Sequence, residues 1–182
     1  EWRKDLRLTG FDSDYNSLIS ELKVLGKAGI NFYCGNILSI QNQNLASSEK
    51  YDVVFSCRCI INIKNFVDQK KAIIHMWNLV KPGGRLIMME NSVETHKYQN
   101  ILRMSLGLKR RPVPPFNKFF TKKLLDSFGE HLGKTWYQWH WGEYGIGDLH
   151  DLMLYVMIPA LNPKKNNAPG KWAYKHKLVE IA

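Results

Sequence analysis

Polar side chains stand directly after four short apolar runs of the sequence. In chain order these are Asp12 and Ser13, then Asn36 with the apolar Ile37 beside it, then Ser56, Cys57 and Arg58, and finally Glu90. If each run is a strand of a parallel sheet, the polar residues meet at the carboxyl edge, where open α/β sheets bind ligands. A carboxylate there can accept hydrogen bonds from both hydroxyls of a ribose, and a guanidinium can hold an acidic group. Structural alternatives stay open: a helix cap at Asp12, a turn at Asn36, core packing at Ile37 and a surface ion pair at Arg58.

No residue is singled out as a general base, so the catalytic group stays unknown. The candidates are Glu90, His96 and His140, because carboxylates and imidazoles are common proton acceptors. A surface or structural role is the alternative for each, and the aromatic residues alternating around His140 indicate strand packing. The pair Cys57-x-Cys59 is not followed by a second pair at zinc spacing, so we expect no metal.

A long stretch of the chain carries charge of one sign. Between residues 97 and 123 there are eight Lys or Arg and no Asp or Glu: Lys97, Arg103, Lys109, Arg110, Arg111, Lys118, Lys122 and Lys123. Such a density repels itself and is tolerated more easily when an anion docks nearby. We therefore expect a basic lid whose Arg110 and Arg111 hold an anionic substrate. The alternative is the solvated face of an ordinary helix.

The elements that would position these residues alternate between strand and helix, which predicts an α/β domain with a mostly parallel sheet. Strands are predicted over residues 6–11, 31–34, 51–57, 85–90 and 134–141. Helices are predicted from a cap at Ser13 or Asp14 to Gly26, and over 65–80, 121–130 and 148–161. Residues 41–50 indicate a loop, and residues 92–120 a long connection of the kind that forms lids.

Four motifs follow one another in a fixed order along these elements. They are Gly10-Phe11-Asp12, then Gly35-Asn36, then residues 51–56, then a helix that runs into Val80-Lys81-Pro82-Gly83-Gly84. Over residues 6 to 90 this order resembles the class I S-adenosylmethionine-dependent methyltransferases, from their second strand to their fifth. Residues 58–62, with Gly107-Leu108 and Pro115-Phe116-Asn117, are similar to methyltransferases that modify small molecules or sugars.

The resemblance implies S-adenosylmethionine as the cofactor and a Rossmann-like sheet with the strand order 3-2-1-4-5-7-6. The cofactor-binding residues that it implies are Asp12, Ser13, Asn36, Ile37, Ser56 and Cys57. The substrate-binding residues are Arg58, Arg110, Arg111 and Asn117. The first strand with its G-x-G-x-G loop is not found, nor is a convincing seventh strand. We therefore expect residues 1–182 to form one incomplete domain that is inactive alone.

Composition limits the class of protein and of partner. Apolar residues make up 45% and charged residues 23% of the 182 residues, a globular balance. No apolar run approaches the roughly 20 residues that cross a bilayer, and the three cysteines indicate reduced core thiols, so we expect a cytoplasmic protein. The net charge of +10 favours a phosphorylated, acidic or nucleic-acid partner.

These patterns leave three functional hypotheses. The leading one is methyl transfer to the O or N of a small anionic acceptor, such as a sugar or a phosphorylated metabolite. The charge also suits an RNA methyltransferase, although the third strand lacks the Asn/Asp-Pro-Pro-aromatic motif of enzymes that methylate base amines. A non-catalytic Rossmann-like binding module is the third.

Overall fold

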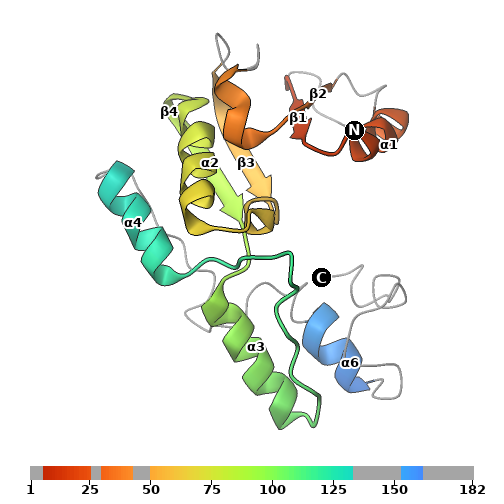
Figure 1. The fold of residues 1–182 in the computed structure, drawn as a ribbon. Coiled ribbons are helices and arrows are strands. Elements are labelled where there is room, and N and C mark those ends of the chain that lie inside the picture. The colour runs from red at the N-terminus through yellow and green to blue at the C-terminus, as the bar shows by residue number, and fades with distance from the viewer. Residues whose placement is uncertain (1–5, 26–29, 43–49, 133–152, 162–182) are drawn as a thin grey trace. The chain divides into compact units, whose positions relative to one another are not determined.

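The computed structural model describes residues 6–25, 30–42, 50–132 and 153–161 (Figure 1). Two compact units divide the chain. Unit 1 comprises Glu1–Phe55 and Lys71–Ile87, and unit 2 comprises Ser56–Lys70 and Met88–Ala182. Strands and helices alternate over the first ninety residues, which confirms the α/β class.

The first strand–helix–strand segment of unit 1 follows the prediction closely. β1 (Thr9–Asp12) and β2 (Asn31–Cys34) pair in parallel, with Asp12 opposite Cys34 at the carboxyl end. α1 (Tyr15–Leu25) packs against both strands. Asp14 caps this helix, because its Oδ1 accepts the N–H of Asn16 at 3.1 Å and its carbonyl accepts the N–H of Leu18. A short 3₁₀ element, η2 (Ile37–Asn42), follows β2.

The second pair of strands is β3 (Tyr51–Cys57) and β4 (Val80–Met89), joined by α2 (Phe66–Asn78). The Tyr51 N–H donates to the Leu79 carbonyl before the strands, and the Arg58 N–H donates to the Met89 carbonyl at their end. The two strands therefore run parallel. The prediction was wrong at one boundary, because the helix ends at Asn78 and the strand begins at Val80, not at residue 85.

Two glycines explain how β4 begins so early. Gly83 has a φ of +79°, a conformation that residues with a Cβ rarely adopt. A Cβ on Gly84 would lie 2.7 Å from the Asp52 carbonyl oxygen and 2.7 Å from Cγ1 of Val80. The Lys-Pro-Gly-Gly segment is thus a bend inside the strand where the two backbones approach closely.

β3 is less buried than its continuous apolar run predicts. Val53 is 51% exposed, Phe55 is 66% exposed and Ile87 on the neighbouring β4 is 46% exposed. Parallel strands are normally covered on both faces. The continuous run Val53-Val54-Phe55 predicts a buried strand, and this prediction is wrong because apolar side chains of β3 and β4 remain uncovered.

Unit 2 contains η3 (Ile60–Asn62), α3 (Val93–Ser105), α4 (Lys122–Leu132), and the π-helical turn η5 (Met153–Met157) that leads into α6 (Ile158–Leu161). α3 corrects the prediction of a long connection over 92–120, since a capped helix occupies almost half of it. Ser92 caps α3 by accepting the Thr95 N–H on its Oγ at 3.0 Å. Beyond the helix, the chain returns so that Phe120 bridges Ser92.

α3 buries its polar face, and this explains why the periodicity of apolar residues did not predict it. Its buried side chains are His96, Gln99, Asn100 and Arg103, whereas Tyr98, Ile101 and Met104 are exposed. Asn100 holds the returning chain through the Arg111 backbone, with its Oδ1 accepting at 2.7 Å and its Nδ2 donating at 3.0 Å. Arg103 Nε donates to the Lys109 carbonyl at 3.0 Å.

The remaining elements meet the predictions where the structure describes them. Thr121 caps α4, because its Oγ1 accepts the Leu124 N–H at 3.2 Å. The last predicted helix is present from residue 153 and ends at Leu161. The predicted strand 134–141 and most of the loop 41–50 lie outside the described residues. No helix among the described residues is long and apolar enough to span a membrane.

The cysteines correct one further expectation. Cys34, Cys57 and Cys59 are free, but all three are exposed and do not lie in a core.

We expect Gly84→Ala to destabilise unit 1 by about 2 kcal/mol, because the new methyl group overlaps the Asp52 carbonyl and separates β3 from β4. Gly83→Ala is the matched control, since a Cβ there meets nothing and only the positive φ is penalised, by about 1 kcal/mol. Urea unfolding of both variants measures the difference. Equal stabilities would show that β3 and β4 do not need the close approach at Gly84.

Candidate functional site

The carboxyl ends of β1 and β2 lie side by side and carry four of the predicted cofactor-binding residues. The Gly35 N–H donates to the Asp12 carbonyl at 2.9 Å, so Asp12 and Asn36 follow adjacent strand ends. Asp12 is exposed; its Oδ1 accepts the Asp14 N–H at 2.8 Å, and no bond of its Oδ2 is found among the described residues. One carboxylate oxygen therefore remains available to a ligand hydroxyl, which fits the predicted ribose contact.

The other residues of this edge are held by the backbone. Asn36 Oδ1 accepts the Leu38 N–H at 2.9 Å, which is the turn that the alternative interpretation expected, and its Nδ2 remains available as a donor. Ser13 is exposed beside Cys34, and Ile37 is half-buried. The Ile37 carbonyl lies 2.8 Å from Nδ1 of His75 on α2, which fixes η2 to that helix.

The carboxyl ends of β3 and β4 are organised by the Glu90 carboxylate. Its Oε1 accepts the Ser56 hydroxyl at 2.9 Å and the N–H groups of Cys59 and Ile60 at 3.2 and 3.1 Å. Its Oε2 accepts the Ile61 N–H at 3.2 Å. Glu90 thus binds the loop after β3 through four donors, and its two oxygens are already engaged.

Burial and hydrogen bonding act on this carboxylate in opposite directions. Burial raises the pKa of Glu90 above its ordinary value, and the bonds from Ile60, Ser56, Ile61 and Cys59 oppose the rise. A carboxylate that is fixed by four donors positions a loop more readily than it collects a proton from a substrate. The structure therefore assigns Glu90 a structural contact. Of the other two candidate bases, His140 lies outside the described residues, and His96 lines a pocket in unit 2.

The Gln69 side chain of α2 donates hydrogen bonds to backbone carbonyls of the same loop. Its fully buried side chain places Nε2 within 3.2 Å of the carbonyl oxygens of Ile60 and Ile63, and 2.7 Å from that of Lys118. Residues 60–63 are thus bound at their N–H groups by Glu90 and at their carbonyls by Gln69. We call residues 56–63 the anchored loop.

Two predicted substrate-binding residues meet at this loop. Arg58 is half-buried with a φ of +50°, an uncommon conformation outside glycine, and its carbonyl accepts Asn62 Nδ2 at 3.0 Å. Asn117 Nδ2 donates to Asn62 Oδ1 at 2.6 Å. Asn62 therefore connects Arg58 to Asn117, although 58 residues separate them in the sequence. Ser56 is buried against Glu90, and Cys57 beside it is exposed.

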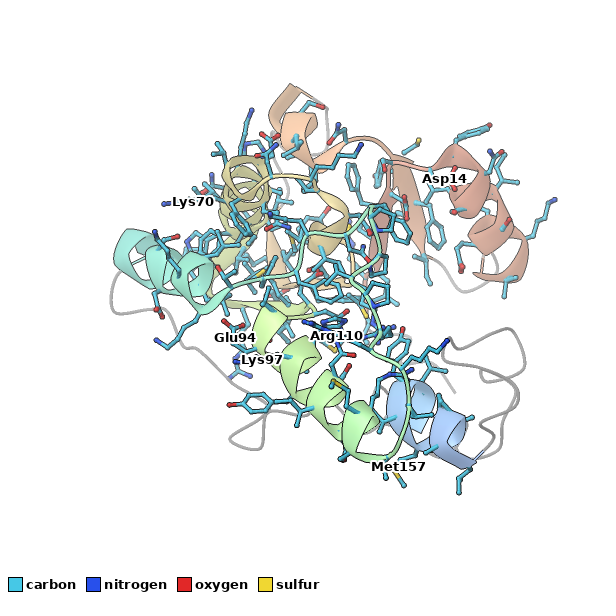
Figure 2. The ribbon with its side chains drawn as sticks, turned by 60° about the horizontal axis from the view of Figure 1, so that its bottom comes forward. Asp14, Lys70, Glu94, Lys97, Arg110 and Met157 are labelled. Atoms are coloured by element: carbon cyan, nitrogen blue, oxygen red, sulfur yellow. The ribbon has the colours of Figure 1, made fainter. Side chains whose placement is uncertain are left out.

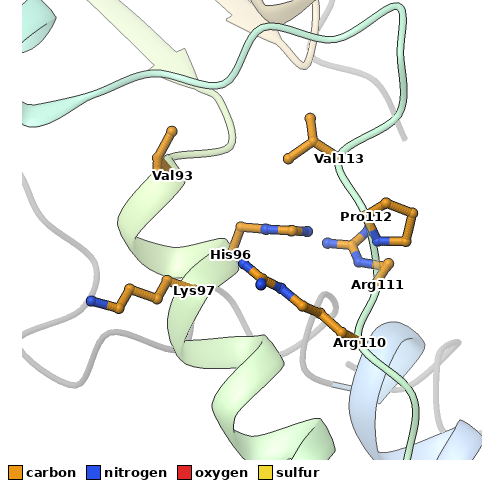
Figure 3. A pocket seen from close by; sticks show the side chains of 7 residues that line it. All are labelled: Val93, His96, Lys97, Arg110, Arg111, Pro112 and Val113. Atoms are coloured by element: carbon orange, nitrogen blue, oxygen red, sulfur yellow. The ribbon is translucent and has the colours of Figure 1, made fainter.

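The other two predicted substrate residues line a separate pocket in unit 2. This open pocket of about 500 Å³ is lined by Val93, His96, Lys97, Arg110, Arg111, Pro112 and Val113. The side chains of His96, Arg110 and Arg111 point toward one another, and Lys97 extends from α3 away from them (Figure 3). Burial lowers the pKa of His96, and the charges of Arg111 and Arg110 lower it further. Burial and the two arginines thus favour the neutral imidazole of His96.

Several functional contacts escaped the sequence predictions. Gln69 is the polar member of an otherwise apolar α2 face, one turn from Phe66 and from Ile73, and that spacing could have indicated its burial. Asn62 and Asn100 are ordinary polar residues by sequence, and nothing in their spacing indicated the contacts they make. Within the described residues, no group of His, Cys, Asp and Glu is arranged to hold a metal ion.

Comparison with known proteins identifies the family. The model of the ubiE/COQ5 methyltransferase family matches residues 14–139. An O-methyltransferase family protein from Burkholderia thailandensis is 16% identical, with a TM-score of 0.49, over 68% of this chain and 38% of that one. PKMT2 from Rickettsia typhi, solved in complex with AdoHcy, is 15% identical, with a TM-score of 0.47, over 95% of this chain and 30% of that one. No curated protein matched.

The chain belongs to the ubiE/COQ5 methyltransferase family, because the family model covers more than half of it. This membership confirms the resemblance to class I methyltransferases and, with it, S-adenosylmethionine as the cofactor. The chain spans 38% and 30% of the lengths of the two solved structures.

Glu90→Ala should lower the free energy of unfolding by about 2 kcal/mol or more, because it leaves four donors of the anchored loop without their acceptor. Glu21→Ala, which removes an exposed carboxylate of α1, is the matched control and should change stability by less than about 0.5 kcal/mol. Chemical denaturation measures both. A Glu90→Ala protein as stable as the control would mean that Glu90 does not hold the loop.

The pH dependence of stability tests the raised pKa of Glu90. A raised pKa means that the stability contributed by Glu90 is fully present below its ordinary value of 4.5 and is lost as the pH rises through the raised value. Glu90→Gln lacks this titration, so the stability of the variant relative to the wild type should rise as the pH increases above 4.5. Urea midpoints at several pH values measure the difference. A relative loss would show that the four hydrogen bonds outweigh burial.

Proposed function

We propose that the protein containing this chain transfers the methyl group of S-adenosylmethionine to the O or N of a small anionic acceptor. The observation that carries the proposal is the match of a methyltransferase family to residues 14–139, a range that includes the anchored loop and the edge at Asn36. S-adenosylmethionine supplies an activated methyl group when it is bound. The residues of this chain then have to bind, orient and shield the two reactants.

Asp12 and Asn36 are the residues proposed to hold the nucleoside part of the cofactor. Each follows a strand end, each is exposed, and each keeps a polar atom available after its turn bonds are counted. Ser13 and Ile37 complete this edge. The accessible groups at neighbouring strand ends support a ligand that spans both strands.

The anchored loop is the proposed place where donor and acceptor meet. Glu90 and Gln69 fix its backbone, so Cys57 and Arg58 keep their positions without a ligand. Such preorganisation favours a reaction that depends mainly on positioning. Arg58 and Asn117, connected by Asn62, are proposed to contact the acceptor.

The strand pairs support the sheet order predicted from the family. β1 pairs with β2 and β3 pairs with β4, as strands 2 and 3 and strands 4 and 5 do in the order 3-2-1-4-5-7-6. We propose that strand 1 fills the place between β1 and β3, and that a preceding segment covers the apolar side chains Val53, Phe55 and Ile87. On this proposal the 182 residues are one incomplete domain that is inactive alone.

Calorimetric titration with S-adenosylhomocysteine tests the cofactor site in the whole protein. Asp12→Asn keeps the Oδ1 acceptor for Asp14 but removes the charge, so the turn should survive while affinity falls. Loss of a charge-assisted contact costs about 1.5 to 3 kcal/mol, or roughly ten- to hundredfold in affinity. Glu21→Gln, another exposed carboxylate of unit 1, serves as the control and should bind normally. Normal affinity in a folded Asp12→Asn protein would exclude Asp12 from the ribose site.

A further inference from the structure

The pocket beside α3 concentrates positive charge against an apolar wall. Of the seven described residues that line it, Lys97, Arg110 and Arg111 are cationic and none is acidic. Val93, Pro112 and Val113 supply the apolar surface. Figure 2 shows Lys97 on α3 and Arg110 on the segment that follows this helix, and both residues belong to unit 2. A ligand that fits must combine an anionic group with an apolar part.

Arg111 is the fixed member of this group. Its backbone is bound twice by Asn100, its Nη2 donates to Gln99 Oε1 at 3.2 Å, and its Cζ lies 3.7 Å from the centroid of the Tyr155 ring. A guanidinium held in this way loses little side-chain entropy when an anion binds.

Arg110 is the exposed member of this group. Its side chain is exposed, and no hydrogen bond or ion pair of its guanidinium is found among the described residues. It nevertheless points into the pocket toward His96 and Arg111 (Figure 3). Two like charges directed at one space repel each other unless an anion lies between them. The arrangement therefore favours an anion bound between the guanidinium groups of Arg110 and Arg111.

His96 adds a neutral hydrogen-bonding group at the base of the pocket. Only 7% of the residue is exposed, its Nδ1 lies 3.3 Å from Asn100 Nδ2, and its ring packs edge-on against Phe119 at 5.3 Å. Burial and the two arginines lower its pKa, which favours the neutral imidazole. The N–H of a neutral imidazole can donate a hydrogen bond to an oxyanion.

We propose that this pocket binds the phosphate group of a small phosphate monoester, with Arg110 and Arg111 on its oxygens, His96 at its base and the apolar part of the molecule against Val93, Pro112 and Val113. A phosphate monoester carries close to two negative charges and three acceptor oxygens, which matches two guanidinium groups and an imidazole better than a carboxylate does. The inference deepens the proposed function by naming the anionic group of the acceptor, but phosphate binding is measurable without methyl transfer.

A polynucleotide fits this site less well than a small molecule. RNA binding needs cations spread along a strand, whereas this pocket places its charges around one space bounded by apolar residues. Arg103, which contributes to the basic composition of the segment, is fully buried and bonded to the Lys109 carbonyl, so it is not part of an exposed basic surface.

The experiment titrates the whole protein with inorganic phosphate and with phenyl phosphate at low ionic strength, following the His96 imidazole resonances by NMR and the affinity by calorimetry. Both ligands should shift His96, and phenyl phosphate should bind more tightly because its ring contacts the apolar wall. Arg110→Ala should weaken binding by about tenfold or more, and the loss should shrink as salt is added.

Matched variants separate a local contact from a general effect of charge. Arg85→Ala removes an exposed arginine of β4, and Lys64→Ala removes an exposed lysine of unit 2, so both should bind phosphate as the wild type does. Lys97→Ala should weaken binding only severalfold, since Lys97 extends away from Arg110 and Arg111. S-adenosylhomocysteine affinity should be unchanged in Arg110→Ala.

Four results would overturn the inference: no phosphate binding by a protein that still binds S-adenosylhomocysteine, equal losses in Arg110→Ala and Arg85→Ala, tighter binding of benzoate than of phenyl phosphate, or displacement of phenyl phosphate by a short single-stranded RNA of higher affinity. Phosphate binding by a protein that fails to bind S-adenosylhomocysteine would instead contradict the proposed function and leave the pocket assignment intact.

Discussion

The candidate site depends on the hydrogen bonds with which the side chains of Glu90 and Gln69 hold the anchored loop. Three consecutive N–H groups and a hydroxyl bind the carboxylate of Glu90, and the carbonyls of Ile60 and Ile63 bind the amide of Gln69. A loop whose donors and acceptors are satisfied by side chains does not need a ligand to order it. This explains how Arg58 is held at a positive φ, which costs free energy that neighbouring contacts must offset.

Polar side chains also order the rest of unit 2, because the buried face of α3 is polar rather than apolar. α3 turns His96, Gln99, Asn100 and Arg103 inward. Asn100 and Arg103 bind the backbone of residues 109–111, Gln99 accepts from the Arg111 side chain, and His96 lies against Asn100. Buried polar groups stabilise a fold only when each finds a partner, so this helix specifies the path of residues 108–111 closely. The phosphate pocket follows from that path, because Arg110 and Arg111 are carried to the face of α3 that holds His96.

The sequence predicted most elements whose signals are local. The strands 31–34 and 51–57 and the Asp14 cap depend on short-range patterns, and the structure confirms them. α3 was missed because its buried face is polar, and an apolar pattern cannot reveal it. The burial of β3 was mispredicted because its apolar run does not show which segments cover it. The bonds from Gln69 to the Lys118 carbonyl and between Asn62 and Asn117 join residues about 50 positions apart, which no local spacing encodes.

Asp12 and Asn36, at the adjacent ends of β1 and β2, are proposed to bind the cofactor in the whole protein, and this is the central proposal. Hydrogen–deuterium exchange with and without S-adenosylhomocysteine tests it most directly, because exchange reports each backbone segment separately. Added protection is expected over residues 10–14 and 35–38, and none over α4. Protection confined to other segments, or no protection under conditions where S-adenosylhomocysteine is bound, would contradict it.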